Sequence, residues 1–391
     1  MLDKMEHKKL KILIFSWRGP GHPNSGGAEI STHEHAKGWV RAGHSVTLFT
    51  SFYLGAKEEE LIDGVKVIRS GPQTLGVQIE AFNWYCFKNH PKFDLVIDQF
   101  HGIPFFTPLY VKVKKLGFIH EVTKEVWRLN PWPIPLNFMV AILGTLLEPL
   151  IFRLYKKIPF MTVSESSRRD LVQWGINRNK ISVIHNGTNT PKFLSSPPKE
   201  SKKTLIYLGA LAKDKGIEDT LRIFSILSNS DQNFQFWVVG KSDPGYLKKI
   251  KLQISNLHLE GKVKFWGFVT ERVKYELLAR AHILINPSVR EGWGLVVIEA
   301  ASVRTPTVAF NVTGLRDSII DGKTGILCKD KTVKCLADEI MKLLNDEREL
   351  KNLSENAYNW SKNFSWEKAT KNSLKLIENL IKNSIYKLKA T

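Results

Sequence analysis

Short apolar segments that alternate with stretches of helical pattern recur along almost the whole chain. A first series lies at residues 10–16, 45–50, 65–68, 94–98, 115–120 and 181–184, and a second at 204–209, 234–240, 263–269, 283–286 and 306–310. Strands that alternate with helices form open parallel sheets, which bind ligands beyond the carboxyl ends of their strands. The sequence therefore predicts an α/β protein in which each series forms a parallel sheet of its own.

A stretch rich in proline, serine and lysine separates the two series. It lacks apolar periodicity, which is typical of a linker. The chain of 391 residues is long enough for two domains. We expect an N-terminal Rossmann-like domain at residues 1–190, a linker at 191–203, a second Rossmann-like domain at 204–366 and a C-terminal helix at 367–391.

The net charge of +19 favours an anionic partner. The lysines are spread along the chain without an arginine-rich arm or a zinc-finger spacing, so we expect an anionic membrane surface rather than nucleic acid. Three cysteines and an N-terminus without a signal-peptide pattern favour the cytoplasm. No Asp-x-Asp sequence occurs, so a metal-held diphosphate is not expected, and we expect no cofactor.

The sequence REGWGLVVIEA at residues 290–300 follows the apolar run 283–287 and predicts a tight loop and a helix start after a strand. Glycines let the backbone approach a ligand, and a helix start offers free amides to an anion. Glu291 in the loop could face the reacting part of a ligand, while Glu299 in the helix could bind hydroxyls beyond a phosphate. This pair suits a nucleotide sugar, and the alternative is a helix N-terminus with two solvated acids.

The same segment resembles the signature of the family 4 glycosyltransferases, which are retaining, nucleotide-sugar-dependent enzymes of the GT-B fold. The resemblance implies two Rossmann-like domains with a cleft between them. It also implies transfer of a hexose-type sugar from a nucleoside diphosphate sugar to an acceptor. Glu291 would be catalytic by positioning the sugar, and Glu299 would hold the ribose. The further substrate-binding residues that the resemblance implies here are Gly292, Trp293, Gly294 and Leu295.

Residues 209–216, GALAKDKG, resemble the family pattern Gly-Arg-Leu-x-x-x-Lys-Gly. In the family, the arginine and lysine of this pattern clamp the donor diphosphate. Lys215 matches and is implied as a catalytic group, but Ala210 stands in place of the arginine. Lys213 or a base of the first domain could substitute for it. Additional candidate substrate-binding residues near strand ends of this domain are Gly209, Phe268 and Val269.

In the first domain, three loops that follow strands resemble the family. Gly26 and Gly27 precede a predicted helix at residues 28–42 and resemble the loop at the domain cleft. His101 lies in a loop that resembles the acceptor side, and His120 matches a catalytic histidine that faces the donor sugar and phosphate. The alternatives are a plain strand–helix loop and ordinary exposed histidines.

Residues 129–147 carry no formal charge, but three prolines in their first half exclude a clean membrane span. Arg153, Lys156 and Lys157 follow. The segment suits a helix in the membrane interface, or equally a core or lid helix. The apolar stripe within residues 374–388 suits a helix that crosses back to the first domain, as in the family, or a membrane-facing tail.

The sequence thus predicts a cytoplasmic or peripheral enzyme on the inner face of the cell membrane. Its partners would be a nucleotide sugar donor and a glycan or lipid-linked acceptor. Two alternatives remain at this point. One is a nucleotide-sugar enzyme without acceptor transfer, such as an epimerase. The other is an inactive basic binding protein, which Ala210 favours.

Overall fold

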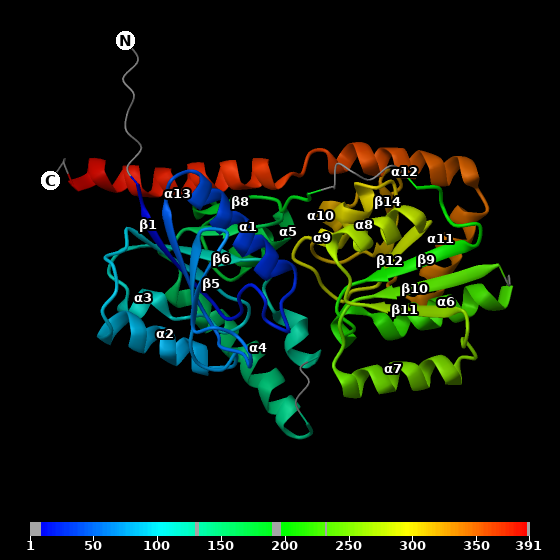
Figure 1. The fold of residues 1–391 in the computed structure, drawn as a ribbon, viewed down its shortest axis with the longest axis horizontal. Helices are drawn as coiled ribbons and strands as arrows, with labels where there is room; N and C mark the ends of the chain where they lie inside the picture. The colour runs from blue at the N-terminus through cyan, green and yellow to red at the C-terminus, as the bar shows by residue number, and fades with distance from the viewer. Residues whose placement is uncertain (1–8, 130–132, 190–196, 231–232, 389–391) are drawn as a thin grey trace, which may run out of the picture. The chain divides into compact units, whose positions relative to one another are not determined.

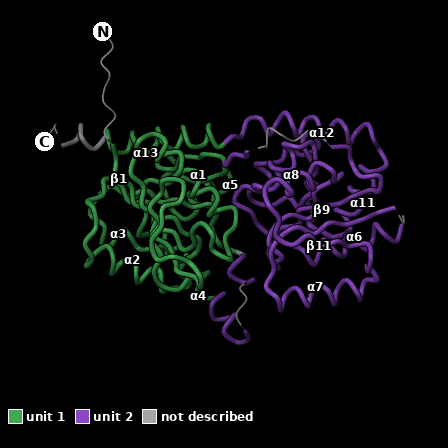
Figure 2. Tube along the Cα trace, viewed as in Figure 1, with its two compact units in different colours: residues 1–124, 142–185, 366–391 green, residues 125–141, 186–365 purple. Residues whose placement is uncertain are grey.

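The structure is a computed structural model that describes residues 9–129, 133–189, 197–230 and 233–388. The chain forms two compact units (Figures 1 and 2), each built around a β-sheet. Unit 1 comprises residues 1–124, 142–185 and 366–391, and unit 2 comprises residues 125–141 and 186–365. Residues 125–141 therefore group with unit 2, although the sequence placed them in the first domain. The side chains that α4 (Leu136–Leu154) buries, Glu148 and Phe152, lie in its second half.

Within the described ranges, the sheet of unit 1 has eight strands in the order β3-β4-β2-β1-β5-β6-β7-β8. All neighbours are parallel except β3 and β4. β3 was not predicted, because it is an exposed edge strand with a weak apolar pattern. The strands are β1 (Lys11–Ser16), β2 (Ser45–Thr50), β3 (Glu59–Ile62), β4 (Val65–Arg69), β5 (Leu95–Gln99), β6 (Lys114–Ile119), β7 (Phe160–Thr162) and β8 (Ile181–Val183).

The strands of unit 1 are mostly apolar and buried, as expected for a parallel sheet covered on both faces. Ile12, Leu13, Ile14 and Phe15 of β1 are examples of this pattern. Besides α4, the helices of this unit are α1 (Gly27–Arg41), α2 (Gly76–Phe87), α3 (Thr107–Tyr110), α5 (Glu165–Gln173), the short 3₁₀ turn Arg178–Lys180, and α13 (Trp366–Leu388).

The C-terminal helix α13 packs against α1 and belongs to unit 1 (Figure 2). The Ser373 hydroxyl accepts a hydrogen bond from Trp39 Nε1 at 3.0 Å and lies 2.9 Å from His35 Nδ1. A Cβ at Gly38 would lie 2.6 Å from the Thr370 side chain, so the missing side chain permits this close approach. Because Ile377 is also buried, this part of the apolar stripe is used inside unit 1.

His35, in this helix contact, makes the stability of the protein dependent on pH. Burial lowers the pKa of His35 to about 4. The unfolded chain takes up this proton near pH 6.5, so stability is retained above about pH 6.5 and is lost as the pH falls toward 4. We expect His35 alone to lower the free energy of unfolding by about 2 kcal/mol between pH 7 and pH 5. Urea denaturation at the two pH values measures this difference.

The matched variants are His35→Gln, which keeps a polar partner for Ser373 but does not titrate, and His258→Gln, which removes an exposed histidine. The first should reduce the pH dependence by about 2 kcal/mol, and the second should leave it unchanged. Equal pH dependence in wild type and His35→Gln would show that His35 does not cause the effect.

The sheet of unit 2 is parallel throughout, with its six described strands in the order β11-β10-β9-β12-β13-β14. These strands are β9 (Lys203–Leu208), β10 (Phe234–Val239), β11 (Val263–Gly267), β12 (Ile283–Asn286), β13 (Thr307–Phe310) and β14 (Gly325–Cys328). The predicted strands of the second series coincide with β9 to β13 to within two residues at each end. The helices are α6 (Ile217–Ser230), α7 (Pro244–Asn256), α8 (Glu271–Arg280), α9 (Leu295–Ala301), α10 (Leu315–Ser318), α11 (Val333–Leu344) and α12 (Glu347–Ser361), with 3₁₀ turns Lys124–Leu129 and Lys213–Lys215.

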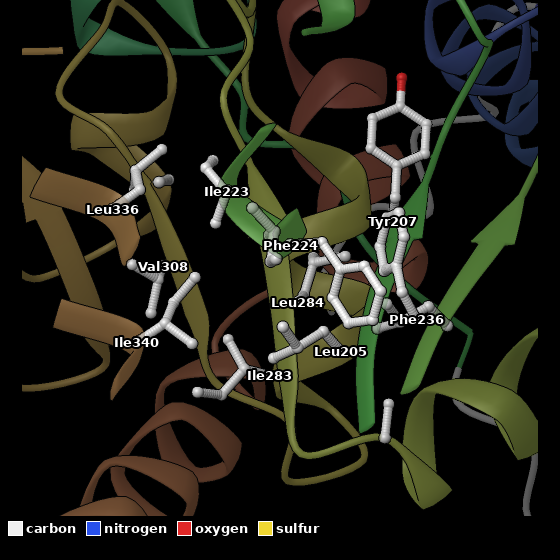
Figure 3. Packing of buried hydrophobic residues seen from close by; sticks show 14 of the residues in the cluster. Leu205, Tyr207, Ile223, Phe224, Phe236, Ile283, Leu284, Val308, Leu336 and Ile340 are labelled. Atoms are coloured by element: carbon white, nitrogen blue, oxygen red, sulfur yellow. The ribbon is translucent and has the colours of Figure 1, made fainter. Parts of the chain in front are cut away.

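Apolar side chains from the sheet and from the helices that cover it fill the core of unit 2 (Figure 3). Leu205 of β9 and Leu284 of β12 are fully buried beside the rings of Phe224 and Phe236. The two rings lie 5.3 Å apart between centroids. Helix α6 supplies its buried residues at helical spacing, so that one face covers the sheet. This rigid core fixes where the strands end, and the loops that follow them carry the candidate site.

The predicted linker is only partly a linker, because its last residues pack on unit 2. Residues 191–196 lie outside the described residues. Lys199 Nζ donates hydrogen bonds to the carbonyl oxygens of Ala281 at 2.6 Å and Arg304 at 3.1 Å, and to Thr305 Oγ1 at 2.9 Å. Glu200 pairs with Arg280. These polar contacts hold the chain before β9, and a composition argument could not reveal them.

Helix α4 exposes most of its apolar side chains. In the most apolar 18-residue stretch of α4, only 11% is buried inside the protein. By length and composition, α4 could cross a membrane. No other helix among the described residues meets that criterion. Part of the predicted segment, residues 130–132, lies outside the described residues. The structure therefore does not place the described part of this segment in a core, and an interfacial helix or a lid helix remains as an interpretation.

Candidate functional site

Lys215 and Glu291 come together at the carboxyl ends of two neighbouring strands of unit 2. Lys215 lies in the 3₁₀ turn that follows β9, and Glu291 lies in the loop that follows β12. Lys215 Nζ donates a hydrogen bond to Glu291 Oε1 at 3.0 Å, and Ser288 Oγ donates to the same oxygen at 2.9 Å. Both charged side chains are partly exposed. The sequence predicted both residues, and the structure brings them into direct contact.

Two close backbone approaches hold these loops in place. A Cβ at Gly216 would lie 2.3 Å from the Pro287 carbonyl oxygen, and Gly216 has a φ of +73° that favours glycine. The Val289 amide donates to the Asp214 carbonyl at 2.9 Å, which ties the two loops together. A Cβ at Gly314 would lie 2.2 Å from the Glu291 carbonyl oxygen. The Lys215–Glu291 pair is therefore built on a fixed backbone.

Glu299 lies one turn into α9 and is 7% exposed. Lys274 of α8 donates a hydrogen bond to its Oε1 at 2.8 Å. Burial raises the pKa of Glu299, and the ammonium group of Lys274 opposes that shift. Lys274 also contacts Glu271 at 2.7 Å. Sequence reasoning missed Lys274, because nothing in the pattern of α8 distinguishes it from an ordinary surface lysine.

The other residues predicted in the 290–300 segment differ in accessibility. The Trp293 side chain is 3% exposed and packs edge-on against Phe364, with 5.0 Å between ring centroids. Its indole is therefore buried within unit 2. Gly292 and Gly294 are also buried, and Leu295 begins α9. The resemblance implied that Trp293 contacts the substrate, and this role stays a prediction for a residue whose ring packs against Phe364.

The remaining predictions in unit 2 lie at the ends of β9 and β11. The Gly209 amide donates to the Val239 carbonyl at 3.0 Å, directly after β9. Phe268 is 75% exposed, and Lys241 Nζ lies 4.1 Å from its ring centroid. Val269 packs against the core of the unit. Since β10 separates β11 from β9 in the sheet, Phe268 and Lys215 lie at different strand ends of the same sheet edge.

Residue 210, in the first turn after β9, is alanine where the family pattern has arginine, so this turn carries no guanidinium group at that position. Its carbonyl oxygen accepts a hydrogen bond from the Tyr207 hydroxyl at 2.6 Å, and the residue is exposed. Lys213 is exposed on the next turn. The loop therefore keeps its conformation without the arginine, and Lys215 is the cation of this loop that contacts Glu291.

In unit 1, His120 directly follows β6 and is buried. Ser167 Oγ donates a hydrogen bond to the His120 carbonyl at 2.7 Å, and the buried Glu148 of α4 accepts from the Thr123 amide at 2.8 Å. Within the described chain, neither ring nitrogen of His120 has a hydrogen-bond partner. Burial lowers the pKa of His120 to about 3, with a contribution from neighbouring histidines. A neutral ring with buried, unsatisfied nitrogens is a candidate for contact with a ligand.

His101, Gly26 and Gly27 lie in other loops at the same edge of the unit 1 sheet. His101 Nδ1 lies 3.9 Å from Glu121 Oε1. Gly26 is the N-cap residue of α1, and its amide donates to Glu29 Oε2 at 2.6 Å. Arg18 Nε donates to the other oxygen of Glu29 at 3.0 Å. The Gly26 amide is therefore already occupied by a carboxylate of its own helix.

Comparison with protein families identifies both halves of the chain. Residues 25–192 match the model described as "Glycosyltransferase Family 4", and residues 190–360 match "Glycosyl transferases group 1". The two matches are consecutive and leave only the ends of the chain uncovered. The chain therefore belongs to the glycosyltransferase family that these two models describe, as the sequence signature predicted.

Individual relatives support this assignment. An uncharacterized glycosyltransferase of Methanocaldococcus jannaschii, MJ1607, is 25% identical over 93% of this chain and 97% of its own length. The chain spans only about half the length of two other curated relatives, 55% of the uncharacterized glycosyltransferase MJ1178 of Methanocaldococcus jannaschii and 52% of the capsular polysaccharide biosynthesis glycosyltransferase CapM of Staphylococcus aureus.

Solved structures show the same architecture. Sucrose-phosphate synthase from Thermosynechococcus elongatus has a TM-score of 0.78 at 20% identity, covering 96% of this chain and all of that one. HepE from Anabaena, solved with UDP-glucose, has a TM-score of 0.68 at 19% identity, covering 95% of this chain and all of that one. The fold is GT-B, with two parallel-sheet α/β domains, as predicted.

Proposed function

We propose that this protein transfers a hexose-type sugar from a nucleoside diphosphate sugar to an acceptor, with retention of the anomeric configuration. The observation that carries the proposal is the contact between Lys215 and Glu291, which joins two loops at the carboxyl edge of the unit 2 sheet. The buried Glu299 follows in the same segment. The similarity to HepE, whose structure contains UDP-glucose, supports a nucleotide sugar as the donor.

Each of these side chains has a distinct role in the proposed reaction. The bond from the anomeric carbon to the diphosphate breaks, a bond to the acceptor oxygen forms, and the acceptor proton leaves with the diphosphate. Lys215 stabilises the negative charge that develops on the departing diphosphate, so the step does not require a metal ion. Glu291 accepts hydrogen bonds from the sugar hydroxyls, and Glu299 accepts them from the ribose. In unit 1, we assign to His120 contact with sugar or phosphate oxygens through its unsatisfied ring nitrogens.

The proposed function is tested by binding and by turnover. A thermal-shift screen over nucleoside diphosphates and their sugars identifies the donor. Donor consumption is then measured with and without an acceptor extract. Consumption that requires the acceptor supports the transferase. Conversion of the donor without an acceptor would indicate an epimerase-like enzyme, and binding without turnover would indicate the inactive binding protein that Ala210 allows.

The acceptor is proposed to be a glycan, free or linked to a lipid, and the exposed helix α4 favours a membrane surface. Phe138, Met139 and Leu143 of α4 are all at least half exposed. Arg153 near its end, and Lys156 and Lys157 just after it, are also exposed. An apolar helix beside basic residues suits the interface of an anionic bilayer, where each basic residue contributes about 1 kcal/mol.

We expect the protein to float with anionic liposomes of phosphatidylglycerol and phosphatidylcholine at low salt. The attraction should weaken at 1 M salt, because the Debye length falls to about 3 Å. Replacing Phe138, Met139 and Leu143 with serine should reduce flotation, while the control Leu252→Ser, at an exposed apolar residue of α7, should not. Thermal unfolding should be similar in both variants. Absence of flotation for the wild type at low salt would contradict membrane docking and leave the transferase proposal intact.

A further inference from the structure

Unit 1 contains a pocket that none of the candidate site residues lines. Its volume is about 580 Å³, within the usual range of small-molecule sites. It lies where β2 and β4 end, because Phe52 and Tyr53 follow β2 and Arg69 is the last residue of β4. Open parallel sheets bind ligands beyond the carboxyl ends of their strands, so this is a favourable position for a substrate subsite.

The wall of the pocket is organised by the buried guanidinium group of Arg69. It donates hydrogen bonds to the carbonyl oxygens of Lys57 and Pro20, both at 3.0 Å, and pairs with Glu60 Oε1 at 2.6 Å. Pro20 belongs to the glycine-rich loop that leads to Gly26. Arg69 therefore connects the pocket to a loop that the sequence predicted as part of the substrate site.

The lining combines aromatic rings with carboxylates. Phe52, Tyr53 and Trp84 contribute rings, and Phe52 is partly open to solvent. Glu58 and Glu59 also line the pocket and are exposed, and Glu59 Oε2 pairs with Lys66 Nζ at 2.8 Å. The charge of Arg69 is already compensated by Glu60. The charge of Glu59 is likewise compensated, by Lys66. The lining thus presents apolar faces and one further carboxylate, Glu58, which accepts hydrogen bonds and disfavours an anionic ligand.

We propose that this pocket binds a neutral or amino pyranose unit of the acceptor. The C–H face of a pyranose ring packs on the electron-rich face of an aromatic ring. Its hydroxyl or ammonium groups donate hydrogen bonds to the carboxylates, and these charge-assisted bonds are the stronger kind. A phosphorylated or uronic sugar would meet Glu58 as a like charge. The assignment of this sugar as the acceptor rests on the proposed glycosyltransferase function, whereas sugar binding by the pocket does not.

The experiment uses the full chain on an array of neutral, amino, uronic and phosphorylated oligosaccharides, followed by calorimetry with the sugar that binds best. Glu58→Gln should raise the Kd for that sugar about tenfold, the loss expected for a hydrogen bond to a charged group. Phe52→Ala should raise it about two- to tenfold through loss of the aromatic contact. The control Leu61→Ala removes an exposed apolar side chain on β3 outside the pocket and should leave the Kd unchanged.

Binding of nucleoside diphosphate is measured on the same variants and should be unaffected in all three. The proposal is overturned if no sugar binds, if anionic sugars are preferred, or if both pocket variants bind as the wild type does. Sugar binding that weakens in the pocket variants, in a protein that binds no nucleotide, would support the pocket and refute the proposed transferase. If the protein binds nucleotide and transfers sugar, but the pocket variants bind the sugar as tightly as the wild type, the transferase is supported and the sugar-binding pocket is refuted.

Discussion

Replacing Lys215 with alanine is expected to lower kcat by about 10²–10³-fold, the effect typical of removing one preorganised group that stabilises a developing charge. Lys215 is held 3.0 Å from Glu291 Oε1 by loops that leave little room for rearrangement. Ala210 supplies no second cation in the loop after β9, so more of the charge stabilisation rests on Lys215. Steady-state transfer kinetics with the donor and acceptor found by screening measure the change.

The matched control is Lys213→Ala, which removes an exposed lysine from the same 3₁₀ turn. It should change kcat only a few-fold, because Lys213 is exposed and its charge acts on Glu218 of α6, whereas Lys215 contacts Glu291. The Lys215–Glu291 pair is partly exposed, and such pairs contribute about 0–1 kcal/mol to stability, so Lys215→Ala should remain folded. A larger loss of turnover in Lys213→Ala would mean that Lys213, and not Lys215, binds the diphosphate.

The parallel-sheet fold was predictable because its strands are buried on both faces and so appear as nearly continuous apolar runs. β12 illustrates this, since all four of its residues are buried and its predicted bounds were reproduced. β3 escaped prediction because it is an exposed edge strand that pairs antiparallel with β4. The packing of Lys199 on unit 2 was also not predicted, because its partners include backbone carbonyl oxygens that are distant in the sequence.

The candidate site was predictable where loop chemistry depends on local sequence. Gly292 and Gly294 follow Glu291 in its loop, and Lys215 immediately precedes Gly216, whose positive φ favours glycine. The packing of Trp293 was not predictable, because a sequence shows that an aromatic residue is present but not whether its ring faces solvent or Phe364. Lys274 was missed for a related reason, since its pairing with Glu299 joins two helices whose contact depends on tertiary packing.

Replacing Glu299 with alanine is expected to raise the Kd for the nucleoside diphosphate roughly ten- to 150-fold, as the loss of a charged hydrogen bond costs roughly 1.5–3 kcal/mol. The change also leaves Lys274 with one carboxylate partner in place of two, which destabilises a partly buried ammonium group. Binding and stability must therefore be measured separately, by calorimetry with the diphosphate and by urea denaturation.

Two further variants separate these effects. Glu299→Gln keeps an oxygen that can accept the Lys274 hydrogen bond but removes the negative charge, so it should weaken nucleotide binding with a smaller loss of stability than Glu299→Ala. Glu271→Gln removes the charge of the other, exposed partner of Lys274 and should leave the Kd unchanged. If Glu299→Ala binds the nucleoside diphosphate as tightly as the wild type, Glu299 acts only as the structural partner of Lys274. The ribose must then be bound by another residue of the unit.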